Sequence, residues 1–270
     1  MYKEKILVVG GDSRQIELFK ILQKNGYETY KFALPGDEDL PDIADIIVLP
    51  LPSFNAENQI NTPLSNKSIN IKDLYTVITS NTKIFGGNIP ENIDFKNAAL
   101  VYDYNKDEAL TILNAALTAE AAISIAIGES KGSLFNSKCL VTGYGRIGKI
   151  LSNYLKSLKA NVFVCARKKS DFALIETNGL TPLTYSELNN KISQFNYAFN
   201  TVPSLVFNSD LLNNVNPEIL IIDLASKPGG IDYIEANHNN IKAIHALSLP
   251  GKFSPKKSAE LIAKTIIPLF

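Results

Sequence analysis

Residues 138–148 read Lys-Cys-Leu-Val-Thr-Gly-Tyr-Gly-Arg-Ile-Gly and decide the fold of this chain. The apolar run at 138–142 is typical of a buried parallel strand, and a helical pattern follows over 147–158. Of the three glycines, Gly143 allows a tight turn, Gly145 lets the backbone approach a pyrophosphate, and Gly148 lets helix and strand pack closely. A G-x-G-x-x-G sequence in this strand-turn-helix context predicts a Rossmann unit with a dinucleotide at the helix N-terminus.

Residues that follow the neighbouring strands complete the predicted cofactor site. The strand at 161–166 ends in Arg167-Lys168-Lys169-Ser170, where an NAD-specific site has Asp or Glu on the ribose 2′-hydroxyl. A basic run suits the 2′-phosphate of NADP, so the sequence favours NADP over NAD, and a solvated basic turn is the alternative. The predicted cofactor residues are Gly143, Tyr144, Gly145, Arg146, Ile147, Arg167, Lys168, Ser170, Thr201, Val202, Pro203, Asp223 and Ala225.

Alternating strand and helix patterns on both sides of a helical stretch at 106–128 predict an α/β protein with two doubly wound parallel-sheet domains. We expect an N-terminal domain over 1–130 and the Rossmann domain over 131–253, with a boundary near 128–132. The last helical pattern, 254–270, is expected to pack back on the first domain. Expected strands of the first domain are 5–10, 27–32, 45–50, 82–86 and 99–102, with a helix at 14–25 and a long loop at 55–73.

Composition excludes several classes of protein. The 27 basic and 27 acidic residues balance, so the sequence carries no electrostatic footprint for nucleic acid or an anionic membrane. The N-terminus turns polar too early for a signal peptide, and the apolar stretch 115–127, interrupted by Glu120, is expected to fall short of a membrane span. We therefore expect a cytosolic protein. Cys139 and Cys165 lie in apolar runs and are interpreted as buried thiols, without a disulfide or a metal site.

Five stretches, in this order and spacing, resemble the family of the dipicolinate synthase A subunit. They are Gly10 to Gln15, Gly143 to Gly148, Asn200 to Ser204, Asp223 to Gly230, and Leu249 to Gly251. The resemblance covers nearly the whole chain. It implies NADP-dependent oxidation of a dihydrodipicolinate ring to the aromatic pyridine dicarboxylate in the mother cell of a sporulating bacterium. It also implies a flavoprotein-like partner, the dipicolinate synthase B subunit.

A dicarboxylate substrate calls for cationic side chains and helix N-termini. The turn Gly10-Gly11-Asp12-Ser13-Arg14-Gln15 offers both, and it departs from the dinucleotide fingerprint because Asp12 and Gln15 replace two glycines. We therefore interpret it as a substrate turn, the alternative being a plain Asp12 N-cap with a surface Arg14. The predicted substrate and catalytic residues are Asp12, Arg14, Gln15, Thr118, Glu120, Ser226 and Lys227. Thr118 and Glu120 lie on the predicted helix, where they are expected to face either the cleft between the domains or solvent.

Two other functions compete with this one. The first is a dehydrogenase of the 2-hydroxyacid or alanine type; the hydroxyacid type needs an acid-base His and a carboxylate-binding Arg beside the nicotinamide. Only His245 is a serious candidate for the acid-base group, and the 223–227 segment offers Lys227 and no arginine. Alanine dehydrogenase and transhydrogenase share an Asp, Ala and Gly-Gly pattern like that of Asp223 to Gly230, so kinship of fold is expected. The third function is a non-catalytic subunit that senses NADP. An oligomer is expected in every case.

Overall fold

The computed structural model describes residues 4–270, which fall into two compact units. The first unit comprises the chain up to Asn114 together with Pro250–Phe270, and the second comprises Ala115–Leu249. The division therefore lies within helix α2 (Glu108–Glu129), between Asn114 and Ala115 and ahead of the expected boundary at 128–132. The reason is packing, because the Asn114 side chain accepts a hydrogen bond from Ser258 in the first unit, whereas the alanines of the next turns lie in the core of the second.

The first unit contains a five-stranded parallel sheet with the order β2-β1-β3-β4-β5. Each strand lies where the β-rich runs predicted one. Between β3 and β4 the chain forms isolated bridges and one 3-10 turn instead of an α-helix, as the lack of periodicity in 55–73 indicated. The bounds are β1 Lys5–Val9, β2 Glu28–Phe32, β3 Ile46–Val48, β4 Lys83–Gly86, β5 Leu100–Asp103, and the 3-10 turns Ile71–Leu74 and Tyr104–Lys106.

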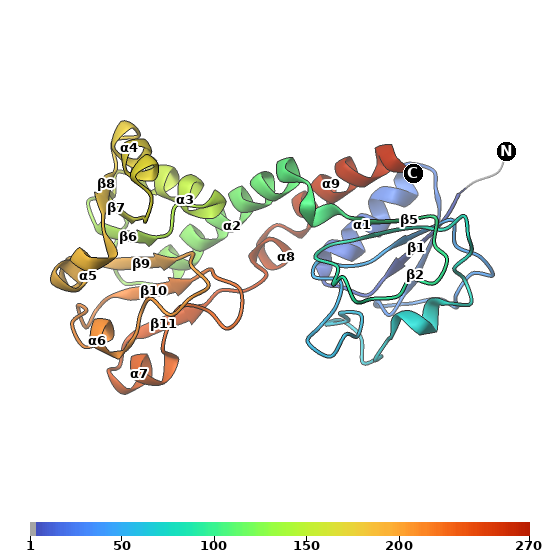
Figure 1. Cartoon of the computed structure of the whole chain (residues 1–270), viewed down its shortest axis with the longest axis horizontal. Helices are drawn as coiled ribbons and strands as arrows, with labels where there is room; N and C mark the ends of the chain where they lie inside the picture. Colours follow the sequence, from blue (N-terminus) through green and yellow to red (C-terminus); the bar gives the residue numbers. More distant parts are fainter. Residues whose placement is uncertain (1–3) are drawn as a thin grey trace. The chain divides into compact units, whose positions relative to one another are not determined.

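Two helices of the first unit, α1 (Ser13–Lys24) and α9 (Pro255–Ile266), pack side by side, although they come from opposite ends of the chain (Figure 1). Pro255 occupies the first turn of α9, where its missing N–H costs nothing. Buried apolar side chains on both helices, including Leu18, Leu22, Ile262 and Ile266, drive this packing. The C-terminal segment is thus part of the first unit, and the short helix α8 (Leu249–Phe253) leads into it.

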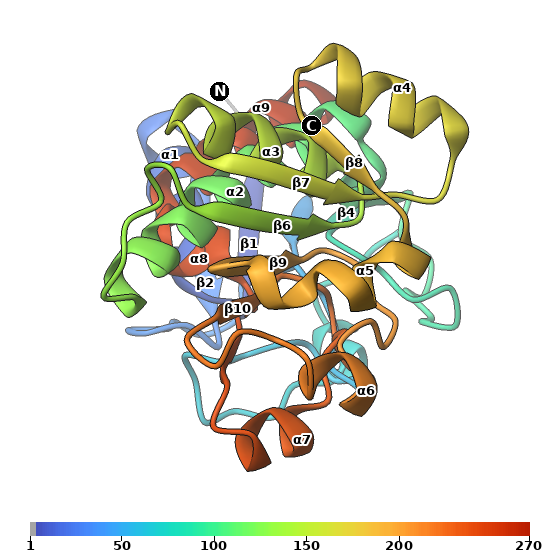
Figure 2. The same cartoon turned by 90° about the vertical axis from the view of Figure 1, so that its left-hand side faces the viewer.

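The second unit contains a six-stranded parallel sheet with the order β11-β10-β9-β6-β7-β8. Figure 2 shows β7, β6, β9 and β10 side by side. The strand order reverses next to β6, and ligands of such sheets bind at the carboxyl ends beside this point. The bounds are β6 Lys138–Thr142, α3 Arg146–Ser157, β7 Asn161–Cys165, α4 Lys169–Thr177, β8 Thr181–Leu183, α5 Tyr185–Lys191, the 3-10 turn Ile192–Gln194, β9 Tyr197–Asn200, α6 Ser209–Leu212, β10 Leu220–Asp223, α7 Tyr233–His238 and β11 Lys242–His245.

Helix α2 covers the helical stretch that the sequence predicted at 106–128. Its 22 residues reach the length and hydropathy of a membrane span, so the expectation that it falls short was wrong. A core helix of a soluble protein passes the same test, and the buried Ala119, Ala122 and Ala126 place this one in the core of the second unit. The helix therefore packs as part of the α/β fold.

Candidate dinucleotide-binding site

The three glycines of the fingerprint each meet a different constraint. Gly143 has φ +91°, and a Cβ there would lie 2.5 Å from Thr201 Oγ1. A Cβ at Gly148 would lie 2.2 Å from the carbonyl oxygen of Gly143, so only glycine allows helix α3 to start this close to β6. By contrast, a Cβ at Gly145 would have no atom within 4 Å. The turn is therefore rigid at both ends and open in the middle.

The open position coincides with the N-terminus of helix α3. Gly145 is its N-cap and provides no side chain to bond the free N–H groups of the first turn. Gly145 and Arg146 are both exposed. An unblocked helix N-terminus next to open space is what a pyrophosphate requires, because the N–H groups and the helix dipole stabilise its charge. The residues present thus fit a dinucleotide.

Two of the predicted fingerprint residues have side chains that face inwards. Tyr144 is buried, and its hydroxyl accepts a hydrogen bond from Asn178 Nδ2 at 3.3 Å. Ile147 packs against the core of the second unit. Their contribution to a ligand therefore comes from the backbone, and the sequence alone did not make this distinction.

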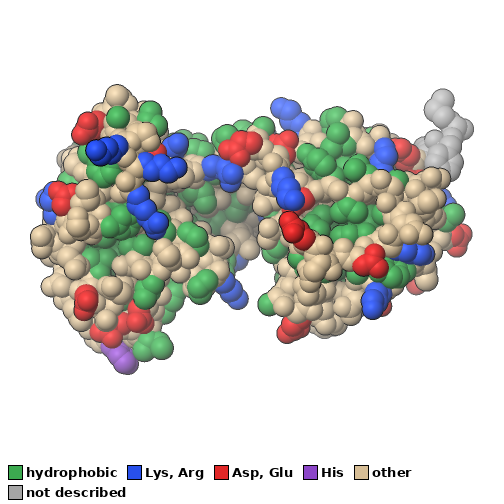
Figure 3. Space-filling model, viewed as in Figure 1, with side chains coloured by type: hydrophobic (Ala, Val, Ile, Leu, Met, Phe, Trp, Pro, Cys, Tyr) green, Lys and Arg blue, Asp and Glu red, His purple; other side chains and the backbone are tan. Residues whose placement is uncertain are grey.

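The basic run after β7 lies at the surface. Arg167, Lys168, Lys169 and Ser170 are all exposed, and basic side chains are visible near α4 in Figure 3. Helix α4 begins at Lys169, so Ser170 sits in its first turn, where N–H groups are unpaired. Cations, a hydroxyl and a helix start together form a site suited to a phosphate group.

A cavity of about 240 Å³ adjoins this run. Its lining includes Arg167 and Tyr185 together with Ser204, Leu205 and Val206 from the segment after β9. Its position between the residues that follow β7 and β9, with polar and apolar walls, suits an adenine ring. Burial raises the pKa of the Tyr185 phenol to about 12, so this side chain is neutral at neutral pH and Arg167 carries the charge of the cavity wall.

A buried polar network connects the carboxyl ends of the three central strands. Asn200, at the end of β9, accepts a hydrogen bond from Thr142 Oγ1 at 2.6 Å and donates one to Asp223 Oδ1 at 2.8 Å. All three residues are fully buried. Next to them Thr201 donates from its hydroxyl to the carbonyl of Thr142 at 2.8 Å, while Val202 is half-buried and Pro203 is exposed. The network fixes the edge of the sheet on which the nicotinamide half of a dinucleotide would rest.

Asp223 has a different role from the one that the sequence suggested. Its Oδ1 also accepts from the backbone N–H of Ala225 at 3.1 Å, and its Oδ2 accepts from the N–H of Gly230 at 2.8 Å and the hydroxyl of Tyr233 at 3.0 Å. Because both oxygens are occupied and the residue is fully buried, we correct its prediction as a cofactor ligand. Asp223 positions the 224–230 loop instead.

His245 completes the support of that loop. Its Nε2 lies 3.0 Å from the carbonyl oxygen of Ala225, and its ring stacks on Tyr233 with centroids 5.5 Å apart. Ala225 is buried, whereas Ser226 and Lys227 are exposed. The two exposed residues are therefore the part of this loop that can reach a ligand.

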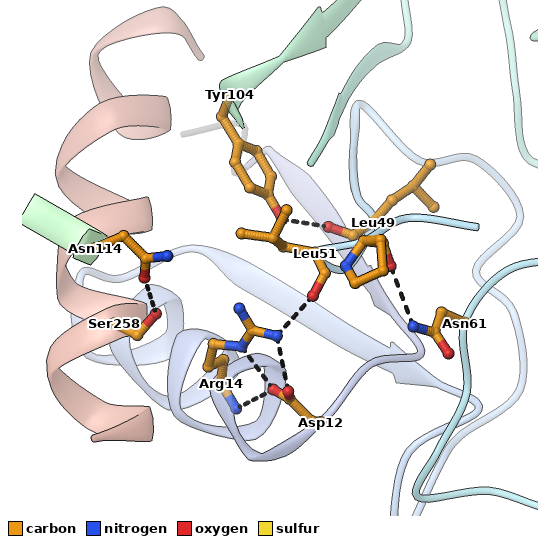
Figure 4. A network of polar contacts seen from close by, with 9 residues as sticks. Asp12, Arg14, Leu49, Leu51, Asn61, Tyr104, Asn114 and Ser258 are labelled. Atoms are coloured by element: carbon orange, nitrogen blue, oxygen red, sulfur yellow. Dashed lines mark hydrogen bonds and ion pairs between the residues drawn. The ribbon is translucent and has the colours of Figure 1, made fainter. Parts of the chain in front are cut away.

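In the first unit, Asp12 and Arg14 form an ion pair at the start of α1 (Figure 4). Arg14 donates from Nε to Asp12 Oδ1 at 2.9 Å, and from Nη2 to Asp12 Oδ2 at 2.8 Å and to the Leu51 carbonyl at 2.6 Å. Asp12 is also the N-cap, accepting from the backbone N–H of Arg14 at 3.0 Å. Arg14 is only 5% exposed, so the alternative of a surface arginine was wrong. These contacts use Nε and Nη2 of the Arg14 guanidinium and do not involve Nη1.

The amide of Gln15 forms hydrogen bonds within the fold. The residue is 2% exposed, and its amide nitrogen donates to the carbonyl oxygens of Val48 at 3.2 Å and Val9 at 3.5 Å. The side chain thus joins the ends of β1 and β3, which gives Gln15 a structural role, and its predicted catalytic role stays a prediction. On α2, Glu120 is exposed and Thr118 is half-buried.

Comparison with known proteins shows to which family this chain belongs. The model for the N-terminal domain of the dipicolinate synthase A subunit matches residues 5–102. The dipicolinate synthase A subunit of Bacillus subtilis is 31% identical, over 98% of this chain and 95% of that protein. The chain belongs to the family of the dipicolinate synthase A subunit.

Solved structures agree with this assignment. The crystal structure of the dipicolinate synthase A subunit from Bacillus halodurans superposes with a TM-score of 0.86 and 25% identity, covering 98% of this chain and 97% of that one. A transhydrogenase from Sinorhizobium meliloti, 15% identical over 97% of this chain and 92% of that one, has a TM-score of 0.71 and shows likeness of fold alone. The expected kinship of fold with transhydrogenase is thus confirmed, and the chain has the fold of the nicotinamide-dependent dehydrogenases.

Three residues of this member of the dipicolinate synthase family were missed or undervalued by sequence reasoning. Tyr185 begins a short helix that carried no apolar periodicity, and Tyr233 lies in a polar stretch after the Gly-Gly pair. His245 was noticed only as a candidate acid-base group. The signal available for Tyr185 was Thr184-x-x-Glu187, a capping box that marks a helix start beside the basic run. Across residues 4–270, no cluster of three or more His, Cys, Asp or Glu side chains could hold a metal.

Proposed function

We propose that this protein is the NADP-dependent dehydrogenase subunit of a dipicolinate synthase and oxidises dihydrodipicolinate to pyridine-2,6-dicarboxylate. The observation that carries the proposal is the fingerprint turn, open at Gly145 and closed at Gly143 and Gly148, in a chain related over its length to the dipicolinate synthase A subunit. The names of those relatives give dipicolinate as the product, and the dihydropyridine substrate and the oxidation by NADP are part of the proposal.

Different residues of the second unit would bind different parts of the cofactor. The first turn of α3 would hold the pyrophosphate, and Arg167, Lys168 and Ser170 the 2′-phosphate. Thr201, Val202 and Pro203 would border the ribose and the nicotinamide. Once bound, the oxidised nicotinamide supplies the hydride acceptor. NADP is proposed over NAD because the turn after β7 carries cations where an NAD site carries a carboxylate.

The chain's part in the reaction is mainly positioning. Loss of a hydride and a proton from a dihydropyridine ring produces an aromatic ring, so the site does not need a strong base. Asp223, Tyr233 and His245 hold the 224–230 loop in place, and Ser226 and Lys227 stand exposed on it to contact a substrate carboxylate. In the first unit, Nη1 of Arg14 is available for a carboxylate, with Asp12 fixing its direction.

Turnover by the purified chain tests the proposal. Dihydrodipicolinate, produced in situ, is offered with NADP or NAD, and absorbance at 340 nm is followed together with dipicolinate formation. We expect reduction of NADP in step with dipicolinate. NADP binding without turnover, in the presence or absence of a partner protein, would instead favour a sensing subunit. Oxidation of 2-hydroxyacids or alanine in the same assay would favour the other dehydrogenase type.

The family name marks the protein as one subunit of an enzyme, which implies a second, partner subunit. We propose that the partner is the flavoprotein-like B subunit of dipicolinate synthase and that both act in the cytoplasm of the mother cell during sporulation. Co-purification of a tagged chain from sporulating and vegetative cells tests both statements. Recovery of no flavoprotein-like partner from sporulating cells would contradict the first, and equal abundance of the chain in vegetative cells would contradict the second.

A further inference from the structure

Tyr185 lies between the fingerprint turn and the basic run. Its ring faces the guanidinium of Arg167, 5.8 Å from the ring centroid. We propose that Tyr185 determines cofactor specificity by holding Arg167 in position for the 2′-phosphate of NADP. This inference rests on the proposed preference for NADP and adds a residue that no sequence motif assigned.

The position of Tyr185 is fixed from its own side. It is the first residue of α5, directly after a capping box in which Glu187 N–H donates to Thr184 Oγ1 at 3.2 Å and Thr184 N–H donates to Glu187 Oε2 at 2.9 Å. The ring is half-buried and lines the 240 Å³ cavity. Tyr185 is therefore a built part of the wall and not a freely rotating surface side chain.

Arg167 needs such a support. It is exposed at the end of a strand, and a long exposed side chain loses considerable rotamer entropy when it is held in one place. The guanidinium carbon lies 5.8 Å from the centroid of the Tyr185 ring, within the range of a cation-π interaction. A guanidinium held over the ring still has its N–H groups available for a bidentate contact with a phosphate. The ring thus pre-organises the cation before the ligand arrives.

The charge state of the pair supports this arrangement. Desolvation raises the pKa of the Tyr185 phenol to about 12, so the ring stays neutral and does not form an ion pair with Arg167. The positive charge of the guanidinium remains available to the 2′-phosphate. A carboxylate at position 185 would have neutralised it.

A double-mutant cycle measures the effect. The probes are adenosine 2′,5′-bisphosphate and 5′-AMP, and their dissociation constants are measured by calorimetry on the full chain. The ratio of the two constants reports the contribution of the 2′-phosphate alone. The parent is compared with Tyr185→Leu, Tyr185→Phe, Arg167→Ala and the double variant Tyr185→Leu/Arg167→Ala. Arg167→Lys keeps the charge but loses the planar stacking, and Tyr154→Leu removes a tyrosine ring from elsewhere in the same unit as a control.

We expect Tyr185→Leu to reduce the preference for the bisphosphate about two- to fivefold, the range of one exposed cation-π contact. Tyr185→Phe should retain the preference, because the ring is kept, and Arg167→Lys should lose part of it. Tyr154→Leu should not change it. In the Arg167→Ala background, Tyr185→Leu should have no further effect, since Tyr185 acts through Arg167.

Three results would overturn the inference: an unchanged ratio in Tyr185→Leu, an equal loss in Tyr185→Phe, or a further loss in the double variant. Should Tyr185→Leu prove unstable, Arg167→Lys, at an exposed site, decides the role of stacking by itself. If Arg167→Ala leaves the ratio unchanged, the proposed NADP preference fails together with the role of Tyr185. If Arg167→Ala reduces the ratio and Tyr185→Leu does not, only the role of Tyr185 fails.

Discussion

Replacement of Gly145 by valine separates dinucleotide binding from folding. The backbone at this residue has φ −80° and ψ −162°, an extended conformation that any residue adopts, and an added Cβ would have no atom within 4 Å. Valine is a poorer N-cap than glycine by roughly 1 kcal/mol, but the loss of a glycine restricts the unfolded chain and returns about 0.4–1 kcal/mol. We expect the free energy of unfolding to change by less than about 1 kcal/mol.

Dinucleotide binding should suffer much more. The valine side chain occupies the space through which the pyrophosphate approaches the N–H groups at the start of α3. Loss of two charge-assisted hydrogen bonds, at about 1.5 kcal/mol each, amounts to about 3 kcal/mol. The dissociation constant for NADPH should therefore rise about a hundredfold or more.

Titration of NADPH by fluorescence and unfolding in urea measure the two effects on the same variant. Gly128→Ala is a matched control, because this glycine in α2 also has open space around it and lies outside the site. Gly148→Ala is the contrasting variant, expected to fold poorly because its Cβ would lie 2.2 Å from a backbone oxygen. Undiminished NADPH affinity in Gly145→Val would refute the assignment of this turn to the pyrophosphate.

The side-chain contacts support three further predictions. Arg167→Asp should invert the cofactor preference from NADP to NAD, because a carboxylate then faces the ribose; titrations that still favour NADP would contradict this. Arg14→Ala should raise KM for dihydrodipicolinate about tenfold or more, with NADP affinity near normal. It should also lower the free energy of unfolding by about 1–3 kcal/mol, because the half-buried contacts with Asp12 are lost. Unchanged kinetics would make Arg14 purely structural. Burial raises the pKa of Tyr185 from 10.0 to about 12, so its contribution to stability is complete below pH 10 and disappears as the pH rises through 12. Urea unfolding at pH 9 and pH 11 should therefore show a smaller loss in Tyr185→Phe than in the parent, and equal losses would count against this reasoning.

The features that the sequence predicted well are those whose causes are local. The strand-turn-helix around Gly143, Gly145 and Gly148 depends on residues within a dozen positions of one another, and the structure gives Gly143 and Gly148 the tight surroundings expected of them. The strands of the first sheet were likewise visible as short apolar runs. Less periodic elements, such as β8 and α5, escaped because Thr181-Pro182-Leu183 is too short to show a period and α5 is mostly polar.

The roles of individual polar residues were harder to predict, because they depend on partners far along the chain. Gln15 was expected at the substrate, yet its amide nitrogen donates a hydrogen bond to the carbonyl oxygen of Val48, 33 residues away. Asp223 was expected at the cofactor, yet Asn200, 23 residues earlier, donates to its carboxylate. Both residues occupy the carboxyl end of a parallel sheet, where ligand-binding and structural polar groups occur together. Position at that edge alone does not distinguish the two uses.

Hydrogen-bond capacity does distinguish them. A polar side chain whose donors or acceptors are all used within the chain, as in Asp223, can affect a ligand only by positioning other residues. Arg167, Ser226 and Lys227 are exposed at the same edge of the second unit, so these side chains can contact a ligand directly. Arg14 lies between the two classes, buried and paired with Asp12 but with one guanidinium nitrogen left over from these contacts. Substitution of Arg14 should therefore affect stability and substrate binding together, whereas substitution of Arg167 should affect ligand binding alone.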